Sequence, residues 1–203
     1  MLDIYKKILA LSLLSLTSSA FAADFERDHV RDTWYIGFGI GGGFGESLKI
    51  GGQNYRYSEL LDGLDTSGKA FLNFKVGSTL SPNLLLGFDA TALGQSGTNF
   101  GADEHVQINN YFAMLTYFPV RQGFFLRGGG GWSAAMIQLN TFYGDFLSTS
   151  RGFGALVGMG YAFWLGKTFN LTVNLDHSRQ FYDNNNSIDN SKFTALYLGF
   201  DWY

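Results

Sequence analysis

The chain has 203 residues, enough for one domain, and a formal net charge of −3 at neutral pH. This charge gives no support for a nucleic-acid partner, which needs a basic surface, and the absence of cysteine excludes disulfides and thiolate metal sites. Proline is almost absent, aromatic residues make up 17% of the chain, and no long apolar run follows the N-terminal segment, which argues against membrane helices.

The first 23 residues have the pattern of a secretory signal peptide. Two lysines precede an apolar run at residues 8–16, and small residues then lead to an Ala-x-Ala motif. The run is short for a membrane-spanning helix, so a retained anchor or a buried helix is the less favoured alternative. We expect cleavage after Ala22 or Ala23, which removes two lysines and one aspartate and changes the net charge from −3 to −4.

From residue 33 onward, apolar and polar residues alternate, and a period of two predicts strands. We identify eight, at about 33–45, 68–80, 83–94, 106–118, 123–138, 150–164, 168–180 and 192–203. Their connections alternate between three short turns and four long polar loops at about 46–67, 95–105, 139–149 and 181–191. This layout is typical of outer-membrane barrels, which have short periplasmic turns and longer extracellular loops. The sequence therefore predicts an all-β fold, a closed eight-stranded antiparallel up-and-down transmembrane β-barrel over 33–203, after a periplasmic lead at 24–32.

Each predicted strand has a bulky apolar face and a face rich in glycine and polar residues. The period alone does not say which face is inside, because a soluble barrel would point its apolar residues inward. Charges and glycines suit a narrow lumen, and aromatic residues near the short turns suit the interface with the membrane. We therefore expect lipid on the apolar side, with a periplasmic aromatic girdle of Trp34, Tyr117, Phe124, Phe163, Phe169 and Trp202.

Four sequence segments resemble the family of small eight-stranded outer-membrane barrels, the outer membrane protein beta-barrel domain with its opacity-type relatives. They are Trp34-Tyr35-Ile36-Gly37-Phe38-Gly39, Tyr117-Phe118-Pro119, Gly158-Met159-Gly160-Tyr161 and Leu198-Gly199-Phe200-Asp201-Trp202-Tyr203. The resemblance implies that the outer-membrane assembly machinery recognises an outward aromatic residue at the end of the last strand. Here the outward series ends at Trp202, and Tyr203 has inward parity.

The short turn after the second predicted strand allows the register of its hairpin to be inferred. Because Leu80 and Leu84 both face outward across this turn, Lys75 lies opposite Asp89, and both point inward. We expect a lumen charge cluster of Lys75, Asp89, Arg127 and Asp176. An eight-stranded barrel is just wide enough to be filled by side chains, and an unpaired buried charge is costly. A polar plug is therefore the favoured interpretation, and a narrow gated path for ions or small solutes is the alternative.

His177 is the only histidine on a predicted strand, and Ser178 follows it directly. An acyl hydrolase of the outer leaflet would need its nucleophile and base within hydrogen-bond reach. Adjacent strand residues point to opposite faces, so this pair does not meet that need. A lipid-modifying enzyme is therefore the less favoured alternative, and we predict no catalytic, cofactor-binding or metal site.

The favoured function is a structural or surface-interaction role of an integral protein in the outer membrane of a Gram-negative cell. Its surroundings would be outer-membrane lipid and lipopolysaccharide, and four extracellular loops would contact a partner that the sequence does not name. The candidate loop contacts are aromatic residues: Tyr55, Tyr57, Phe142, Tyr143, Phe181 and Tyr182.

Overall fold

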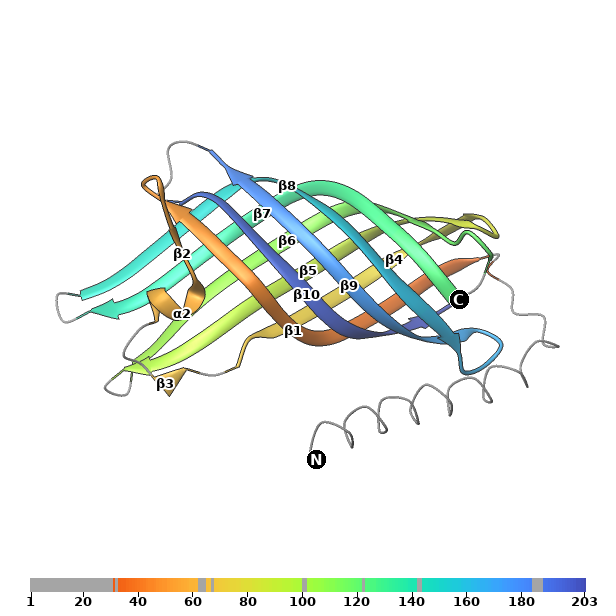
Figure 1. Cartoon of the computed structure of the whole chain (residues 1–203), viewed down its shortest axis with the longest axis horizontal. Helices are drawn as coiled ribbons and strands as arrows, with labels where there is room; N and C mark the ends of the chain where they lie inside the picture. The colour runs from red at the N-terminus through yellow and green to blue at the C-terminus, as the bar shows by residue number, and fades with distance from the viewer. Residues whose placement is uncertain are drawn as a thin grey trace, which may run out of the picture.

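The computed structural model describes residues 31, 33–61, 65–66, 68–99, 102–121, 123–141, 144–183 and 188–203 (Figure 1). The predicted signal peptide and almost all of the predicted periplasmic lead lie outside these residues. Within them, no helix is long and apolar enough to cross a membrane.

The predicted closed antiparallel barrel of eight strands is confirmed. The barrel strands are β1 (Trp34–Ile50), β4 (Ala70–Ser81), β5 (Leu84–Asn99), β6 (Ala102–Tyr117), β7 (Gly123–Thr141), β8 (Gly144–Trp164), β9 (Phe169–Tyr182) and β10 (Ile188–Trp202). Each pairs with its neighbour along the chain, and β10 pairs with β1 to close the sheet. Closure satisfies the backbone hydrogen bonds of every strand, as a hydrocarbon environment requires.

Two of the predicted long loops are wrong, because the strands continue through most of their length. The β5–β6 hairpin stays paired as far as Asn99 and Ala102, and the β7–β8 hairpin as far as Thr141 and Gly144. Both faces of a hairpin that projects into water can be polar, so the period of two fades while the pairing persists. The connection from β1 to β4 also holds structure, namely β2 (Gln53–Tyr55), α2 (Tyr57–Leu60) and β3 (Asp65–Thr66).

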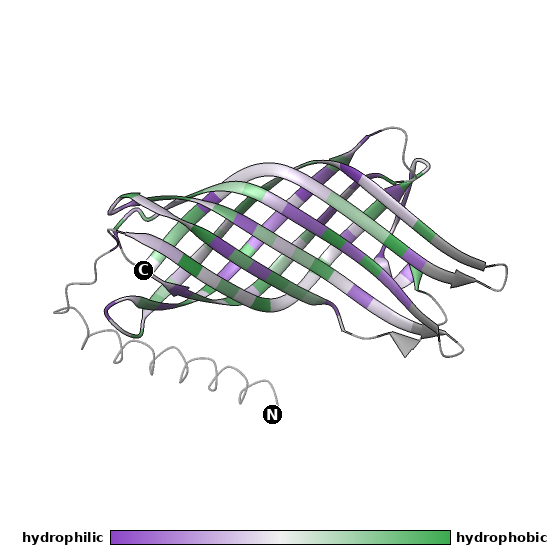
Figure 2. Ribbon diagram, turned by 180° about the vertical axis from the view of Figure 1, so that it is seen from behind, coloured by the Kyte–Doolittle hydropathy of each residue, from purple (hydrophilic) through white to green (hydrophobic). Residues whose placement is uncertain are grey.

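The expected assignment of faces agrees with the burial pattern. Along β9, buried and outward residues alternate from Asn170 to Tyr182, and the outward Val173 and Leu175 are exposed. Figure 2 shows the same alternation as green and purple bands along the strands. Large apolar side chains such as Phe38, Leu72 and Phe153 lie exposed on the outer wall, where lipid would cover them.

The lumen contains three successive layers of side chains. At the end that carries α2 lies an apolar layer, which we call the upper plug: Leu48, Tyr57, Leu61, Phe71, Leu93, Val106, Ile108, Ala135, Ile137, Tyr182, Ile188, Phe193, Ala195 and Tyr197. Buried charges occupy the middle of the barrel, together with a small apolar cluster of Phe112, Met114 and Leu156. At the end with the short turns lies a third layer, the lower plug, of Tyr35, Leu85, Phe118, Phe125, Ala162 and Tyr203.

Candidate functional site

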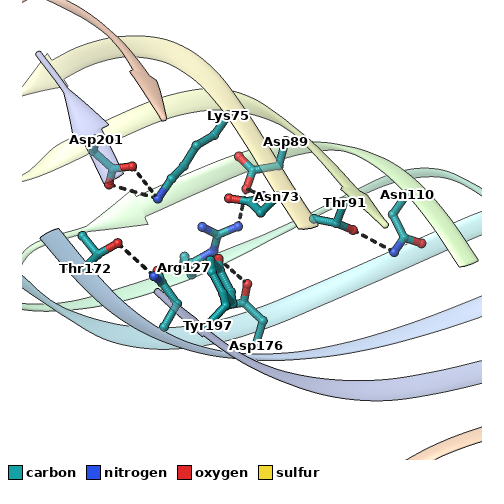
Figure 3. Close-up of polar contacts among 11 residues, drawn as sticks. Asn73, Lys75, Asp89, Thr91, Asn110, Arg127, Thr172, Asp176, Tyr197 and Asp201 are labelled. Carbon is teal, nitrogen blue, oxygen red and sulfur yellow. Dashed lines mark hydrogen bonds and ion pairs between the residues drawn. The ribbon is translucent and has the colours of Figure 1, made fainter. Parts of the chain in front are cut away.

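The charged middle layer of the lumen is built from pairs of oppositely charged side chains (Figure 3). The Lys75 Nζ atom lies 2.9 Å from Asp201 Oδ1 and 3.0 Å from Asp201 Oδ2. Both side chains are 6% exposed, so the pair is nearly cut off from water. A buried pair of this kind costs desolvation, and losing one partner leaves a charge without compensation.

Arg127 is the centre of the second group of charges. Its Nη2 atom donates a hydrogen bond to Asp89, and its Nε atom lies 3.5 Å from Asp176 Oδ1. The Tyr197 hydroxyl donates to Asp176 at 2.8 Å, and Asn73 donates to Asp89 at 3.2 Å. The two carboxylates therefore have both a cation and a neutral donor.

The ion pair of Lys75 corrects our expectation for this residue. The register places Lys75 directly opposite Asp89, as the turn geometry predicts. The ion pair, however, forms with Asp201, which we had left out of the predicted cluster. The reason is a glycine: Gly37 of β1 lies between Lys75 and Asp201 in one row of the sheet. A Cβ atom on Gly37 would lie 2.2 Å from Asp201 Oδ1, so only glycine leaves room for the pair.

The same arrangement recurs across β7, β8 and β9. Gly158 lies directly between Arg127 and Asp176, and a Cβ atom there would lie 2.0 Å from Asp176 Oδ1. A cation, a glycine and a carboxylate thus follow one another on three adjacent strands in both places. This pattern could have predicted the role of Asp201 from the sequence. It requires the pairing of β10 with β1, which places Asp201 and Lys75 on either side of Gly37.

Neutral polar residues continue the network on either side of the charges. Asn110 donates to Thr91 at 3.0 Å and accepts a hydrogen bond from Ser133 at 2.8 Å. Asn174 donates to Thr172 at 2.9 Å. All five residues are buried, so these three hydrogen bonds form away from water.

The upper plug includes two residues from the connection between β1 and β4. Arg56 precedes α2 and its backbone N–H donates to Glu59 at 2.8 Å, which starts the short helix. Tyr57, the first residue of the helix, and Leu61, which directly follows it, point inward and are 0% and 1% exposed. Burial raises the pKa of the Tyr57 hydroxyl well above its ordinary value, so this group stays neutral.

Two of the predicted loop contacts are therefore wrong. Tyr57 and Tyr182 are buried in the upper plug and are not available to a partner. The hydrophobic effect explains their position, because burying a large apolar side chain stabilises the fold by about 1.5–3 kcal/mol. Phe181 is exposed on the outer wall and Tyr55 is half-buried, whereas Phe142 and Tyr143 lie outside the described residues.

Arg31 closes the lumen at the end with the short turns. Its guanidinium carbon lies 3.7 Å from the centre of the Phe118 ring, 4.9 Å from Trp164 and 5.3 Å from Tyr203. It also donates a hydrogen bond to the Arg121 carbonyl. Sequence reasoning missed this residue, because its role depends on a ring of aromatic side chains drawn from three distant segments.

The predicted girdle residues lie on the outer wall near the short turns. Trp34, Tyr117, Phe124 and Trp202 are exposed, and Phe163 and Phe169 are half-buried. The rings of Phe169 and Trp202 contact each other at 4.9 Å between centres. Tyr203 turns inward, as its parity indicates, and its ring lies 5.7 Å from that of Tyr35.

His177 and Ser178 face opposite sides of β9. The His177 ring contacts the Thr194 hydroxyl at 3.0 Å on the outer wall, and Ser178 is buried and donates to the Ala155 carbonyl. Across the described part of the chain, no three His, Cys, Asp or Glu residues are grouped as metal ligands would be.

Comparison with known proteins identifies the same architecture. Ail, the attachment invasion locus protein of Yersinia pestis, solved with the heparin analogue sucrose octasulfate, has a TM-score of 0.57 at 10% identity, covering 84% of this chain and 97% of Ail. Neisserial surface protein A has a TM-score of 0.51 at 13% identity, covering 83% of this chain and 96% of that protein. At these identities the likeness concerns the fold alone.

A comparison with the curated proteins finds no match. The family described as "Outer membrane protein beta-barrel domain", however, matches residues 8–203. Membership of this family implies the outer membrane as the location. Together with the closed ladder and the apolar outer wall, this match shows that the chain belongs to the outer membrane protein beta-barrel family.

Proposed function

We propose that this protein is a closed barrel with a structural and surface-interaction role, and not an open pore. The observation that carries the proposal is the filling of the lumen by the upper plug, the charged layer and the lower plug in succession. An eight-stranded barrel has an interior that side chains can fill completely. Ions would have to displace paired charges in the middle and apolar residues at both ends.

The long hairpins support a surface role. β7 has 19 residues and β8 has 21, whereas about 9–11 tilted residues are enough to cross a bilayer. We infer that the paired ends of these strands extend beyond the membrane as a two-stranded ribbon. Ail, the attachment invasion locus protein, has the same fold, so the fold is compatible with such a role.

Conductance in planar bilayers tests the closed lumen. The refolded protein is expected to give no steady conductance steps. In a second protein, a short Gly/Ser linker replaces residues 53–61, which removes α2 from the upper plug. The charged layer and the lower plug remain in this variant, so its conductance can be compared with that of the unaltered protein. Steady ion-selective current from the unaltered protein, with a selectivity that changes in Arg127→Gln, would establish the pore instead.

Shortening one hairpin tests the surface role. Ile137 and Ser148 face each other in the β7–β8 ladder, so an Asn-Gly turn can replace residues 138–147. Cells that display the shortened barrel should lose adhesion to matrix-coated surfaces while the protein keeps its heat-modifiable mobility on gels. Unchanged adhesion after the same shortening of both long hairpins would contradict the proposal.

We further propose export through the cleaved signal peptide and recognition of the last strand by the assembly machinery. Trp202 supports the second point, because it is the final outward residue of β10 and is exposed. Trp202→Ala should slow insertion of the barrel in cells, whereas Tyr203→Phe should not. Equal insertion rates for all three proteins would contradict this assignment.

A further inference from the structure

Two basic residues face each other on the outer wall of the barrel. Arg179 of β9 and Lys192 of β10 are register partners, and both are exposed. Side chains directly opposite one another on adjacent antiparallel strands have Cβ atoms about 4.5–5.5 Å apart, and like charges in this position are destabilising. An anion between or above the two cations would relieve this repulsion.

Further cations extend this feature along the wall. Ser47 of β1 is the other register partner of Lys192, and Lys49, two residues further along, takes the same outward parity. Arg151 of β8 lies exposed on the far side of β9. We call the four residues on consecutive strands β1, β10, β9 and β8 the outer basic strip: Lys49, Lys192, Arg179 and Arg151.

Among the described residues no member of the outer basic strip forms an ion pair, and the one exposed carboxylate beside it, Asp183 next to Arg151, leaves the strip with a net positive charge. Arg179 lies 5.0 Å from the Phe181 ring, and Arg151 lies 6.0 Å from the Trp132 ring. These ring contacts orient the two guanidinium groups without cancelling their charge.

On the β9–β10 ladder, the strip begins where the run of aliphatic outward residues ends, and the exposed Phe181 follows it on β9. Along the β9–β10 ladder, the outward partners change from Leu175 and Leu196 to His177 and Thr194, and then to Arg179 and Lys192. Apolar, hydrogen-bonded polar and basic pairs thus follow one another within five residues. In an outer-membrane barrel this order places the basic pair at the level of the lipid headgroups on the side of the long hairpins.

We propose that the outer basic strip binds the phosphate groups of a lipid in the outer leaflet, with the acyl chains of that lipid on the apolar wall below. Guanidinium and ammonium groups bind phosphate oxygens through charge-assisted hydrogen bonds, and two cations on adjacent strands match a doubly charged phosphate. The charge complementarity carries the inference, and the adjacent apolar wall selects a lipid. The proposal is independent of whether the lumen conducts.

The opposite side of the barrel provides an internal contrast. There, the outward residues at the corresponding end of β6 and β7 are His105, Gln107, Asn109 and Gln138, which are uncharged or weakly basic. At this end, therefore, the described outward residues of β6 and β7 include no lysine or arginine. A lipid would be held at one position of the circumference and not uniformly around it.

Native mass spectrometry of the refolded barrel, mixed with diphosphoryl lipid A in detergent micelles, tests the proposal. The unaltered protein should retain the lipid, and Arg179→Gln with Lys192→Gln should weaken retention about thirtyfold, since each cation contributes to the attraction of anionic lipid. Lys167→Gln, which removes an exposed lysine of the turn between β8 and β9 at the opposite end of β9, is the matched control and should bind as the unaltered protein does. Heat-modifiable mobility on gels verifies that each variant is folded.

Two further measurements separate the possible anions. Lipid A from which both phosphates have been removed should bind the unaltered protein as weakly as diphosphoryl lipid A binds the double variant. Equal retention of the two lipids, or equal retention by the double variant, would overturn the proposal. A soluble sulfated polysaccharide serves as the competitor. If this polymer displaces the lipid and binds more strongly than the lipid does, the proposal is overturned, because the strip would then bind a partner from the medium.

Discussion

The cations of the lumen form ion pairs with carboxylates, whereas in the described part of the chain those of the outer basic strip do not. Inside, Lys75 and Arg127 each contact a carboxylate, and glycine residues make room for the contact. Outside, Arg179 and Lys192 face each other, and neither has an ion pair within the described chain. Both sets lie on the strands of one sheet, so the difference comes from the solvent on each side.

This difference separates the charges that stabilise the fold from those that are available to bind a ligand. A buried cation must be compensated by the protein itself, because water does not reach it. A cation at the membrane surface can be compensated by water, salt or lipid. The lumen charges should therefore be sensitive to any substitution, and the strip should be sensitive only when the ligand is present.

The largest effect is expected from Arg127→Ala. The substitution leaves Asp89 and Asp176 buried without their cation, which should cost about 3–5 kcal/mol of the free energy of unfolding. Urea unfolding in lipid vesicles, followed by tryptophan fluorescence, measures the change, and Arg179→Ala is the control on the outer wall. A loss below about 1 kcal/mol would show that the lumen network contributes little to stability.

Gly158→Ala tests the row that joins Arg127 to Asp176. The added Cβ would force the Asp176 carboxylate to move, and overpacking of this kind costs about 1–3 kcal/mol. Gly128→Ala is the matched control, because a Cβ there meets its nearest neighbour at 3.7 Å. Equal unfolding midpoints for the two variants would contradict the close packing around Gly158.

A pair of double-mutant cycles distinguishes the two possible partners of Lys75. Lys75→Met combined with Asp201→Asn should show a coupling of about 0.5–3 kcal/mol, typical of residues in one network. Lys75→Met combined with Asp89→Asn should show a smaller coupling, because Asp89 contacts Arg127. A larger coupling of Lys75 with Asp89 than with Asp201 would show that Lys75 interacts mainly with Asp89, its register partner.

Arg31→Ala should lower the free energy of unfolding by up to about 2 kcal/mol, the contribution of a desolvated cation over aromatic rings. The same substitution should raise the rate at which water-soluble quenchers reach Trp164. Lys167→Ala, at the same end of the barrel, serves as the control. If quenching is the same in all three proteins, Arg31 does not close this end.

The smallest effect is expected from Arg179→Gln in vesicles of phosphatidylcholine. Relief of the repulsion from Lys192 should leave stability unchanged or raise it by about 0.2–1 kcal/mol. In vesicles with diphosphoryl lipid A, the same variant should be less stable than the unaltered protein, because it loses the ligand. A similar loss in both lipids would mean that Arg179 serves the fold, as the lumen charges do.

Local rules were enough to predict the strands and their faces. Alternation identifies which residues share a face, and the short turn fixes the register of Lys75 against Asp89. The same rules failed for the hairpins beyond the membrane, since pairing there does not need an apolar face. They also failed for Tyr57, which lies in a short polar segment whose inward direction depends on the space left open at the barrel mouth.

The amino-acid sequence by itself determined the number of membrane strands, the side that meets lipid and the residues that line the lumen. The strands and their shared faces follow from a period of two and from turn chemistry, and the lipid side follows from the charges, glycines and aromatic residues on the two faces. All of these are read from residues that are close together along the chain. Only the tertiary structure decided which lumen charges pair, where Arg31 lies and which cations have no partner. Closure of β10 onto β1 brings together residues more than a hundred positions apart. A pattern formed by neighbouring residues cannot predict contacts at such a separation along the chain.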